Sequence, residues 1–342
     1  MFLKSKLSSY CLIINNEFLY KIGYLDEAKM KNLRKYIVLF ITFLFIIVNI
    51  AGIFIGDYFV DFAFHRSNDA DFHGMPKASA IIVSPDAKPV PKPEFSNRIC
   101  TITADNGEKR NATLFMADNM THNYIILVHG YCRNQEFFWD YADCYLKAGY
   151  NVLTPDLNAS GTSDGEYLTM GSIESDDIVA WSKELVKTDS NAKIVLHGIS
   201  MGAATVMMAT AKDLPDNVVA AVEDCGYTSA YSMFTEQLEK NYDLPGFPVM
   251  NYIDLMSRVK TGYFLSNANP LDAVSKTKIP MLFIHGNQDK LVPLHMEDML
   301  YEASKAPVKK KIVVDGAGHA DSMYVYGDKY FQNIFDFVGA YL

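Results

Sequence analysis

A run of twenty residues without a charged side chain, positions 37–56 (IVLFITFLFIIVNIAGIFIG), constrains this chain more than any other feature. A helix of this length, at about 1.5 Å per residue, covers about 30 Å, the thickness of the hydrocarbon core of a bilayer. A buried core helix usually carries a polar stripe, whereas only Thr42 and Asn49 interrupt this run. A cleaved signal peptide has a shorter apolar core followed by a small-residue cleavage site. We therefore predict a retained transmembrane anchor over residues 37–56.

The charges on either side of this segment predict its orientation. Four basic residues lie between positions 29 and 35, whereas Asp57 and Asp61 follow the apolar run. Because basic residues stay on the cytoplasmic side, we expect residues 1–36 in the cytoplasm and the remainder outside the cell, in a single-pass protein of the cell membrane. Met30, which opens the segment MKNLRK, is an alternative start of the chain. A soluble cytoplasmic enzyme is the alternative to membrane attachment.

Composition excludes several classes of protein for the rest of the chain. Hydrophobic residues make up 49% of the 342 residues and the net charge is -9, which favours a globular domain and argues against a nucleic-acid partner. Residues 1–36 carry 7 Lys and Arg against 3 Asp and Glu, so the part after the anchor is strongly acidic, with 24 against 37. The five cysteines have no close pairs in the sequence and are best interpreted as core thiols. Because disulfide connectivity cannot be read from the spacing of cysteines, a disulfide between Cys132 and Cys225 is left undecided.

Two segments separate the anchor from the folded body. Residues 57–66 (DYFVDFAFHR) are predicted to continue the helix as an aromatic belt at the membrane interface. Four prolines in residues 84–95 (SPDAKPVPKPEF) predict a semi-extended spacer. We therefore assign 57–97 to a juxtamembrane segment with a Pro-rich linker, and 98–342 to a folded domain.

Within the folded domain, short apolar runs alternate with longer amphipathic ones, a pattern typical of a mostly parallel sheet covered by helices on both faces. Two strands joined through Asn106 and Gly107 predict an antiparallel hairpin at the edge of the sheet. The eight predicted strands are 98–104, 109–116, 123–130, 150–156, 193–198, 218–225, 280–286 and 310–316. The predicted helices are 135–148, 172–188, 201–212, 294–305 and 328–341.

A pentapeptide of the form Gly-x-Ser-x-Gly follows the strand at 193–198 and precedes the helix at 201–212. A strand-to-helix turn this sharp crowds the backbone around its central residue, here Ser200, and flanking glycines relieve the clash. The pentapeptide alone also occurs by chance as an ordinary turn. Its position between a strand and a helix favours a serine nucleophile.

Two further strand ends carry the partners that a serine nucleophile needs. Asp289 follows the strand at 280–286, and His319 follows the strand at 310–316. A histidine accepts the serine proton, and a carboxylate orients the histidine. Because the carboxyl ends of parallel strands meet at one edge of a sheet, we predict Ser200, Asp289 and His319 as a catalytic triad. Taken singly, a helix-capping aspartate and a histidine in a loop are the simpler interpretations.

These stretches resemble those of the α/β-hydrolases, over residues 98–342. The matching stretches are LVHGY (127–131), PDLNASGTSDG (155–165), LHGISMGAAT (196–205), EDCGYTS (223–229), IHGNQDKLVP (284–293) and GAGHADS (316–322). The chain is most similar to membrane-anchored or secreted esterase-like and serine-aminopeptidase-like hydrolases of low-GC Gram-positive bacteria. The resemblance implies an α/β-hydrolase fold with an eight-stranded sheet, with Ser200 as nucleophile, His319 as base and Asp289 as orienting acid.

The resemblance also implies an oxyanion hole made of two backbone N–H groups. By position these belong to Met201, which follows the nucleophile, and to Tyr131, which follows a His-Gly pair. Alternatively, Tyr131 is an aromatic residue that lines the pocket. One departure from the family pattern is Asn158, where an arginine is usual, so that Asp156 is expected to lack its habitual partner.

An insertion between two strands predicts a small helical cap over the site. Residues 231–266 contain seven Tyr and Phe side chains, and Pro245 and Pro248 divide two helical pieces. Most of these aromatic side chains are expected to pack the cap onto the sheet, and some to line an acyl or aryl pocket.

Three further histidines, at positions 129, 197 and 285, each end a strand before a glycine. They are interpreted as packing residues, because no spacing typical of a zinc site accompanies them. We predict neither a metal nor a cofactor.

The sequence thus predicts a membrane-anchored serine hydrolase that cleaves a carboxylic ester through an acyl-enzyme. Two alternatives stay open: a peptidase or amidase that uses the same triad, and a non-catalytic binding module of the cell envelope.

Overall fold

The computed structural model describes residues 27–66 and 90–342. The chain divides into two compact units, one up to Phe54 and one from Ile55 to Leu342, and each is considered by itself. The predicted cytoplasmic segment up to residue 26 and most of the Pro-rich spacer, residues 67–89, lie outside the described residues. The second unit, which holds the sheet and its helices and contains the three residues predicted to be catalytic, is called the catalytic unit below.

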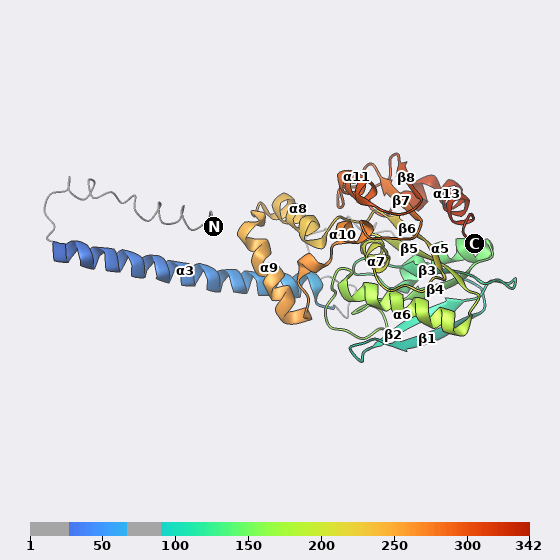
Figure 1. Cartoon of the computed structure of the whole chain (residues 1–342), viewed down its shortest axis with the longest axis horizontal. Coiled ribbons are helices and arrows are strands. Elements are labelled where there is room, and N and C mark those ends of the chain that lie inside the picture. Colours follow the sequence, from blue (N-terminus) through green and yellow to red (C-terminus); the bar gives the residue numbers. More distant parts are fainter. Residues whose placement is uncertain (1–26, 67–89) are drawn as a thin grey trace. The chain divides into compact units, whose positions relative to one another are not determined.

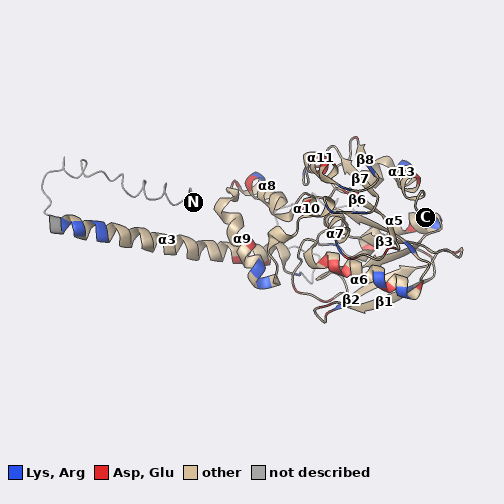
Figure 2. Ribbon diagram, in the orientation of Figure 1, with Lys and Arg blue, Asp and Glu red and all other residues tan. Residues whose placement is uncertain are grey.

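A single helix, α3 (Glu27–Phe64), contains the whole of the predicted anchor. Its basic side chains gather in its first turns, and the following turns are uncharged (Figure 2). With a mean hydropathy of 2.9 over its most apolar stretch, this helix is long and apolar enough to span a membrane. The helix ends eight residues beyond the predicted anchor, and residues 55–64 belong to the catalytic unit. This division differs from the predicted one, which placed the start of the folded domain at residue 98.

The catalytic unit is built on an eight-stranded sheet in the order β1-β2-β4-β3-β5-β6-β7-β8 (Figure 1). The β1–β2 hairpin and the β2–β4 pair are antiparallel, and all other neighbours are parallel, which confirms the predicted fold class. The strands are β1 (Asn97–Thr103), β2 (Lys109–Phe115), β3 (Asn123–Val128), β4 (Asn151–Pro155), β5 (Lys193–Ile199), β6 (Val218–Asp224), β7 (Met281–Gly286) and β8 (Lys309–Val314).

Helices cover both faces of the sheet because its strands are apolar on both sides. In β3, Ile126 and Val128 face one core, and Ile125 and Leu127 face the other. The first core includes α6 (Ser172–Thr188), α7 (Met201–Ala209) and α11 (Leu294–Ala303), and the second includes α5 (Trp139–Lys147) and α13 (Asp328–Val338). Short helices that the sequence analysis did not predict are η1 (Gln135–Phe138), η2 (Leu265–Asn267), α10 (Pro270–Val274) and α12 (Ser322–Tyr326).

Two helices between β6 and β7 form the cap. They are α8 (Ala230–Tyr242) and α9 (Gly246–Thr261), and Pro245 precedes the second. Ser229 begins α8 by accepting a hydrogen bond from the Ser232 N–H, because its hydroxyl satisfies one of the open donors of the first turn. The inward faces of both helices join the first core.

Candidate active site

Ser200 occupies the sharp turn between β5 and α7. Its φ of 58° and ψ of -119° are strained values for a residue with a side chain. A Cβ atom on Gly198 would lie 2.1 Å from the carbonyl oxygen of Gly202, and one on Gly202 would lie 2.1 Å from that of Val128. Only glycine fits at these two positions, so the Gly-x-Ser-x-Gly pattern follows from the backbone. The turn leaves the serine side chain partly exposed above the sheet.

The structure brings the three predicted catalytic residues together at the carboxyl edge of the sheet. His319 Nε2 lies 2.7 Å from Ser200 Oγ, and His319 Nδ1 lies 2.7 Å from Asp289 Oδ2. Because the carboxylate only accepts, Nδ1 carries the ring proton and Nε2 accepts from the serine hydroxyl. The backbone N–H groups of Leu291 and Val292 donate to the other oxygen of Asp289 at 2.8 and 2.9 Å. The arrangement can therefore take a proton from the serine.

A second histidine, His285, contacts the same carboxylate from within β7. Its Nε2 donates to the Val292 carbonyl at 2.8 Å and lies 3.4 Å from Asp289 Oδ2, while its Nδ1 lies 3.9 Å from the Glu297 carboxylate. Burial by itself lowers the pKa of His285, but these two acids raise it to about 10. Burial alone would raise the pKa of Asp289, but His285 and His319 hold it well below its usual range. His285 is therefore a buried cation beside Asp289.

The sequence analysis interpreted His285 only as a packing residue. The residue is fully buried and does pack at the strand end, but it also contacts the predicted catalytic acid. Its position four residues before Asp289 was the feature of the sequence that could have indicated this contact.

A buried pair of acids, Glu223 and Glu297, lies in the same group. Burial and the neighbouring Glu297 raise the pKa of Glu223 well above its usual value, so this carboxyl is neutral. Nothing in the sequence pattern singled out Glu223 or Glu297.

The two residues predicted to form the oxyanion hole lie on either side of Ser200. Met201 is the first residue of α7, so its N–H has no acceptor within that helix. Tyr131 lies in the loop after β3, and its side chain lines the cavity beside Ser200, as the alternative interpretation expected. The Tyr131 hydroxyl donates to the carbonyl of Ala63 in α3. The backbone roles of both residues stay predictions.

Asp156 is bonded by donors other than the arginine that is usual in the family, as the presence of Asn158 led us to expect. It accepts from the backbone and side chain of Gln135 at 2.9 and 3.0 Å, and from the backbone and hydroxyl of Thr162 at 2.8 and 2.9 Å. Asn158, which stands where the family usually has an arginine, instead accepts a 2.9 Å bond from the fully buried Arg110. Amide and hydroxyl donors thus replace the guanidinium at this loop.

Two of the remaining histidines serve the core. His129 Nε2 accepts from the N–H of Leu157 at 3.0 Å, and His197 bonds the hydroxyls of Tyr145 and Tyr330 at 2.8 and 3.1 Å. Burial lowers the pKa of His129, and lowers that of His197 to about 3, so both rings are neutral. These contacts agree with the packing role predicted for them.

One group of side chains among the described residues has a spacing that suits a metal ion. Ligand atoms of Cys225, Asp289 and His319 lie within 4.8 Å of one another. Both ring nitrogens of His319 are bonded, one to Asp289 and one to Ser200, so a metal here would replace the hydrogen bonds of the predicted triad. Cys132 and Cys225 are free thiols, and the disulfide left undecided above does not form.

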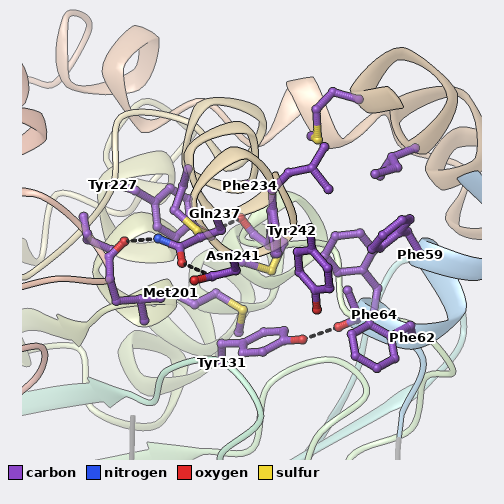
Figure 3. A pocket seen from close by; sticks show the side chains of 18 of the residues that line it. Phe59, Phe62, Phe64, Tyr131, Met201, Tyr227, Phe234, Gln237, Asn241 and Tyr242 are labelled. Carbon is purple, nitrogen blue, oxygen red and sulfur yellow. Dashed lines mark hydrogen bonds between the residues drawn. The ribbon is translucent and has the colours of Figure 1, made fainter. Parts of the chain in front are cut away.

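A cavity of about 290 Å³ opens beside Ser200, between the cap and the end of α3 (Figure 3). Its wall is almost entirely apolar and aromatic, and no charged side chain is among the described residues that line it. The residues are Phe59, Phe62, Ala63, Phe64, Tyr131, Met170, Ser200, Met201, Tyr227, Met233, Phe234, Gln237, Leu238, Asn241, Tyr242, Met250, Ile253, Leu291 and Val292. The sequence analysis predicted the cap side of this wall but not the contribution of α3.

Comparison with known proteins agrees with this geometry. A model of the alpha/beta hydrolase family matches residues 125–332. The protein YqkD of Bacillus subtilis is 30% identical over 210 residues, which is 60% of this chain and 68% of YqkD. YfhR of Escherichia coli is 26% identical over 220 residues, covering 63% of this chain and 69% of YfhR.

Solved structures with similar folds include esterases. The esterase Pf2001 of Pyrococcus furiosus is 26% identical, with a TM-score of 0.59, and the match covers 72% of this chain and 93% of Pf2001. Est1E of Butyrivibrio proteoclasticus, solved with ferulic acid bound, is 22% identical with a TM-score of 0.54, and the match covers 69% of this chain and 98% of Est1E. The second likeness concerns the fold alone. The family match and the likeness to Pf2001 support a hydrolase activity.

Proposed function

Because this chain belongs to the alpha/beta hydrolase family, we propose that it is a serine hydrolase that cleaves carboxylic esters, with Ser200, His319 and Asp289 as its catalytic residues. The observation that carries the proposal is the unbroken chain of two 2.7 Å hydrogen bonds from the Ser200 hydroxyl through His319 to Asp289. A serine in a strained strand-to-helix turn, bonded to a histidine that a buried carboxylate orients, is suited to acyl transfer.

The reaction proceeds in two halves. In the first, Ser200 Oγ attacks the ester carbonyl carbon while its proton passes to His319 Nε2, and the oxyanion faces the backbone N–H groups of Met201 and Tyr131. The tetrahedral intermediate expels the alcohol, which takes the proton from His319, and an acyl-enzyme remains. In the second half, His319 takes a proton from water while the water oxygen attacks the acyl carbon. The second tetrahedral intermediate then breaks its bond to Ser200 Oγ, which takes the proton back from His319, and the carboxylic acid leaves. Asp289 stays ionised and stabilises the imidazolium in both halves.

The proposal includes attachment to the membrane through α3, with the N-terminus in the cytoplasm and the catalytic unit outside. The basic first turns of α3 and the apolar stretch that follows support this orientation. Protease added to intact cells should digest the catalytic unit. Protection of the domain in intact cells, with digestion after lysis, would place it in the cytoplasm instead.

A fluorophosphonate probe tests the mechanism directly, because it reacts with activated serines. The wild-type chain should be labelled, and Ser200→Ala should not. Ser190→Ala, which changes an exposed serine outside the site, is the matched control and should be labelled like the wild type. Equal labelling of Ser200→Ala and the wild type would refute the proposed nucleophile.

Two alternatives are separated from this proposal by simple assays. A non-catalytic binding module predicts no turnover in the wild type, whereas the proposal predicts turnover that His319→Ala abolishes without a change in thermal stability. Amide or peptide cleavage is tested by comparing acyl esters with aminoacyl amides of the same leaving group. The uncharged cavity favours esters, because it offers no partner for the ammonium or carboxylate of a peptide end.

A further inference from the structure

The last two turns of α3 are an integral part of the catalytic unit. Glycine is required at position 56, since a Cβ atom there would lie 2.5 Å from the carbonyl oxygen of Tyr252 in α9. Lys260 of α9 pairs with Asp57 at 2.8 Å and with Asp61 at 2.5 Å. The end of α3 is therefore held against the cap by close backbone packing and by ion pairs.

The loop that follows β4 holds the same helix end from the other side. The N–H of Leu168 donates to the Phe64 carbonyl at 2.8 Å, and the Tyr167 hydroxyl donates to Asp61 at 2.8 Å. Arg66 donates from its guanidinium to the carbonyls of Ser163 and Gly161, each at 2.6 Å. These bonds fix the direction in which the α3 side chains point.

Four α3 residues form one side of the cavity beside Ser200: Phe59, Phe62, Ala63 and Phe64. Phe59 contacts Tyr242 of the cap edge-on, and Phe64 contacts Phe234 of the cap in the same way (Figure 3). The first of the four comes three positions after Gly56, the last residue of the predicted membrane anchor. The helix that is apolar enough to cross a membrane thus also supplies the wall of the substrate cavity.

Several polar groups in this wall are engaged with the protein. Gln237 donates to the Leu291 carbonyl at 2.9 Å and accepts from Asn241 at 2.9 Å. The Tyr227 hydroxyl donates to the Met170 carbonyl at 3.0 Å, and that of Tyr131 donates to Ala63. Because these groups already have partners, the cavity presents mainly hydrocarbon and aromatic surface to a ligand, which suits an alkyl chain.

The outer surface near this helix end is also apolar. The side chains of Phe247 and Val259 on α9 are 79% and 66% exposed, and that of Tyr58 on α3 is 62% exposed. Exposure of large apolar side chains to water is unfavourable in free energy, whereas their insertion at the boundary between lipid headgroups and acyl chains is favourable. The cap and the end of α3 are therefore suited to contact with a bilayer surface.

We propose, on the basis of the function above, that the substrate is a lipid ester resident in the membrane, and that its unbranched acyl chain lies in the cavity between the cap and the end of α3. The ester carbonyl then lies at Ser200, and the acyl chain extends past Ala63 between the α3 and cap aromatics. Hydrolysis yields a fatty acid and the alcohol part of the lipid.

Acyl-chain length is the first test, with the full chain reconstituted in phosphatidylcholine vesicles and p-nitrophenyl esters from acetyl to palmitoyl. We expect kcat/KM to rise by about fourfold for each added methylene until the cavity is filled. Ala63→Leu narrows the cavity and should lower kcat/KM for the longest esters by about tenfold or more relative to its effect on the acetyl ester. Ala211→Leu, at an exposed position beyond α7, is the matched control and should follow the wild type.

The source of the lipid is tested with 4-methylumbelliferyl oleate. It is placed either in the vesicles that contain the enzyme or in separate protein-free vesicles. Faster hydrolysis in the shared vesicles is expected for a membrane-resident substrate, and equal rates in the two arrangements would overturn this part of the inference.

Fluorophosphonate labelling of Ser200 in the same samples distinguishes failure of the lipid inference from failure of the proposed serine hydrolase function. Two results with a labelled Ser200 would overturn the lipid inference but not the serine hydrolase. One is a kcat/KM that does not depend on acyl-chain length, and the other is an equal loss of kcat/KM for short and long esters in Ala63→Leu. Absence of labelling would overturn both.

Discussion

The buried cation beside Asp289 has a measurable effect on the pH dependence of catalysis. His285 and His319 approach the same carboxylate oxygen from 3.4 and 2.7 Å, so the two imidazoles are at most about 6 Å apart. At an effective dielectric constant of about 20, two unit charges at about 6 Å repel by about 3 kcal/mol, which corresponds to about two pH units. Since His285 is positively charged in the folded protein, it opposes the arrival of a second positive charge at the Asp289 carboxylate, where the proposed mechanism forms an imidazolium.

The perturbation is His285→Gln, which keeps a side-chain donor for the Val292 carbonyl and removes the charge. We expect the pH at which half of kcat/KM is lost on the acid side to rise by about one to two units, measured with a soluble short-chain ester over the acid range. Glu223→Gln is the matched control in the same buried group. Because the raised pKa of Glu223 makes this carboxyl neutral, the amide should leave the profile unchanged.

The control for folding is that His285→Gln unfolds cooperatively at a temperature close to that of the wild type. If, in such a protein, the pH at which half of kcat/KM is lost on the acid side is unchanged or lower, the reasoning is refuted. A shift of equal size in Glu223→Gln would also refute it, because the effect would then come from repacking of the buried group and not from the charge of His285.

Three further predictions concern the turn, stability and the α3 contacts. Gly202→Ala should abolish activity and folded yield, because its Cβ would lie 2.1 Å from the Val128 carbonyl oxygen, whereas Ala204→Gly in the same helix should cost only about 1 kcal/mol in a denaturation assay. Folding raises the pKa of His285, so the wild type should have a larger free energy of unfolding than His285→Gln at low pH. This difference should be full below pH 6.5 and should shrink by about 1.4 kcal/mol per pH unit up to about pH 10. A difference that does not depend on pH would contradict this. Lys260→Met should cost about 1 kcal/mol and lower long-chain ester hydrolysis more than acetyl ester hydrolysis, and an equal loss for both would speak against the role given to α3.

The strands, and the meeting of Ser200, Asp289 and His319 at one edge of the sheet, were predictable from sequence because both follow from local patterns. The six inner strands, of five to seven residues each, are largely buried, and all eight expected strands form. The turn at Ser200 is equally local, since the clashes at Gly198 and Gly202 arise from backbone within the turn and from the neighbouring strand β3. Parallel pairing then brings the ends of β5, β7 and β8 to one edge of the sheet.

The residues that sequence analysis missed depend on contacts between segments far apart in the chain. Phe59 and Phe64 belong to residues 57–66, which were predicted to form an aromatic belt at the membrane interface. An aromatic helix end has the same sequence pattern whether its rings face lipid headgroups or protein, so the packing of these two rings against the cap could not be predicted. The charge of His285 arises from Asp289 and Glu297, which both lie outside its strand. A histidine before a glycine at a strand end has the same sequence pattern whether its neighbours in space are acidic or apolar. Arg110 likewise reaches Asn158 across 48 positions.

The contact between Gly56 and the backbone of Tyr252 has a practical consequence for anyone who wishes to produce this enzyme in quantity. Removal of residues 1–66 is the natural choice when the anchor and the spacer are assigned from sequence. It would remove four residues that line the cavity beside Ser200, namely Phe59, Phe62, Ala63 and Phe64, and would leave the cap without its contacts to α3. A soluble version should instead begin near Ile55, with a hydrophilic fusion partner in place of the upstream helix. Assays on the shorter fragment would report the preferences of a damaged pocket.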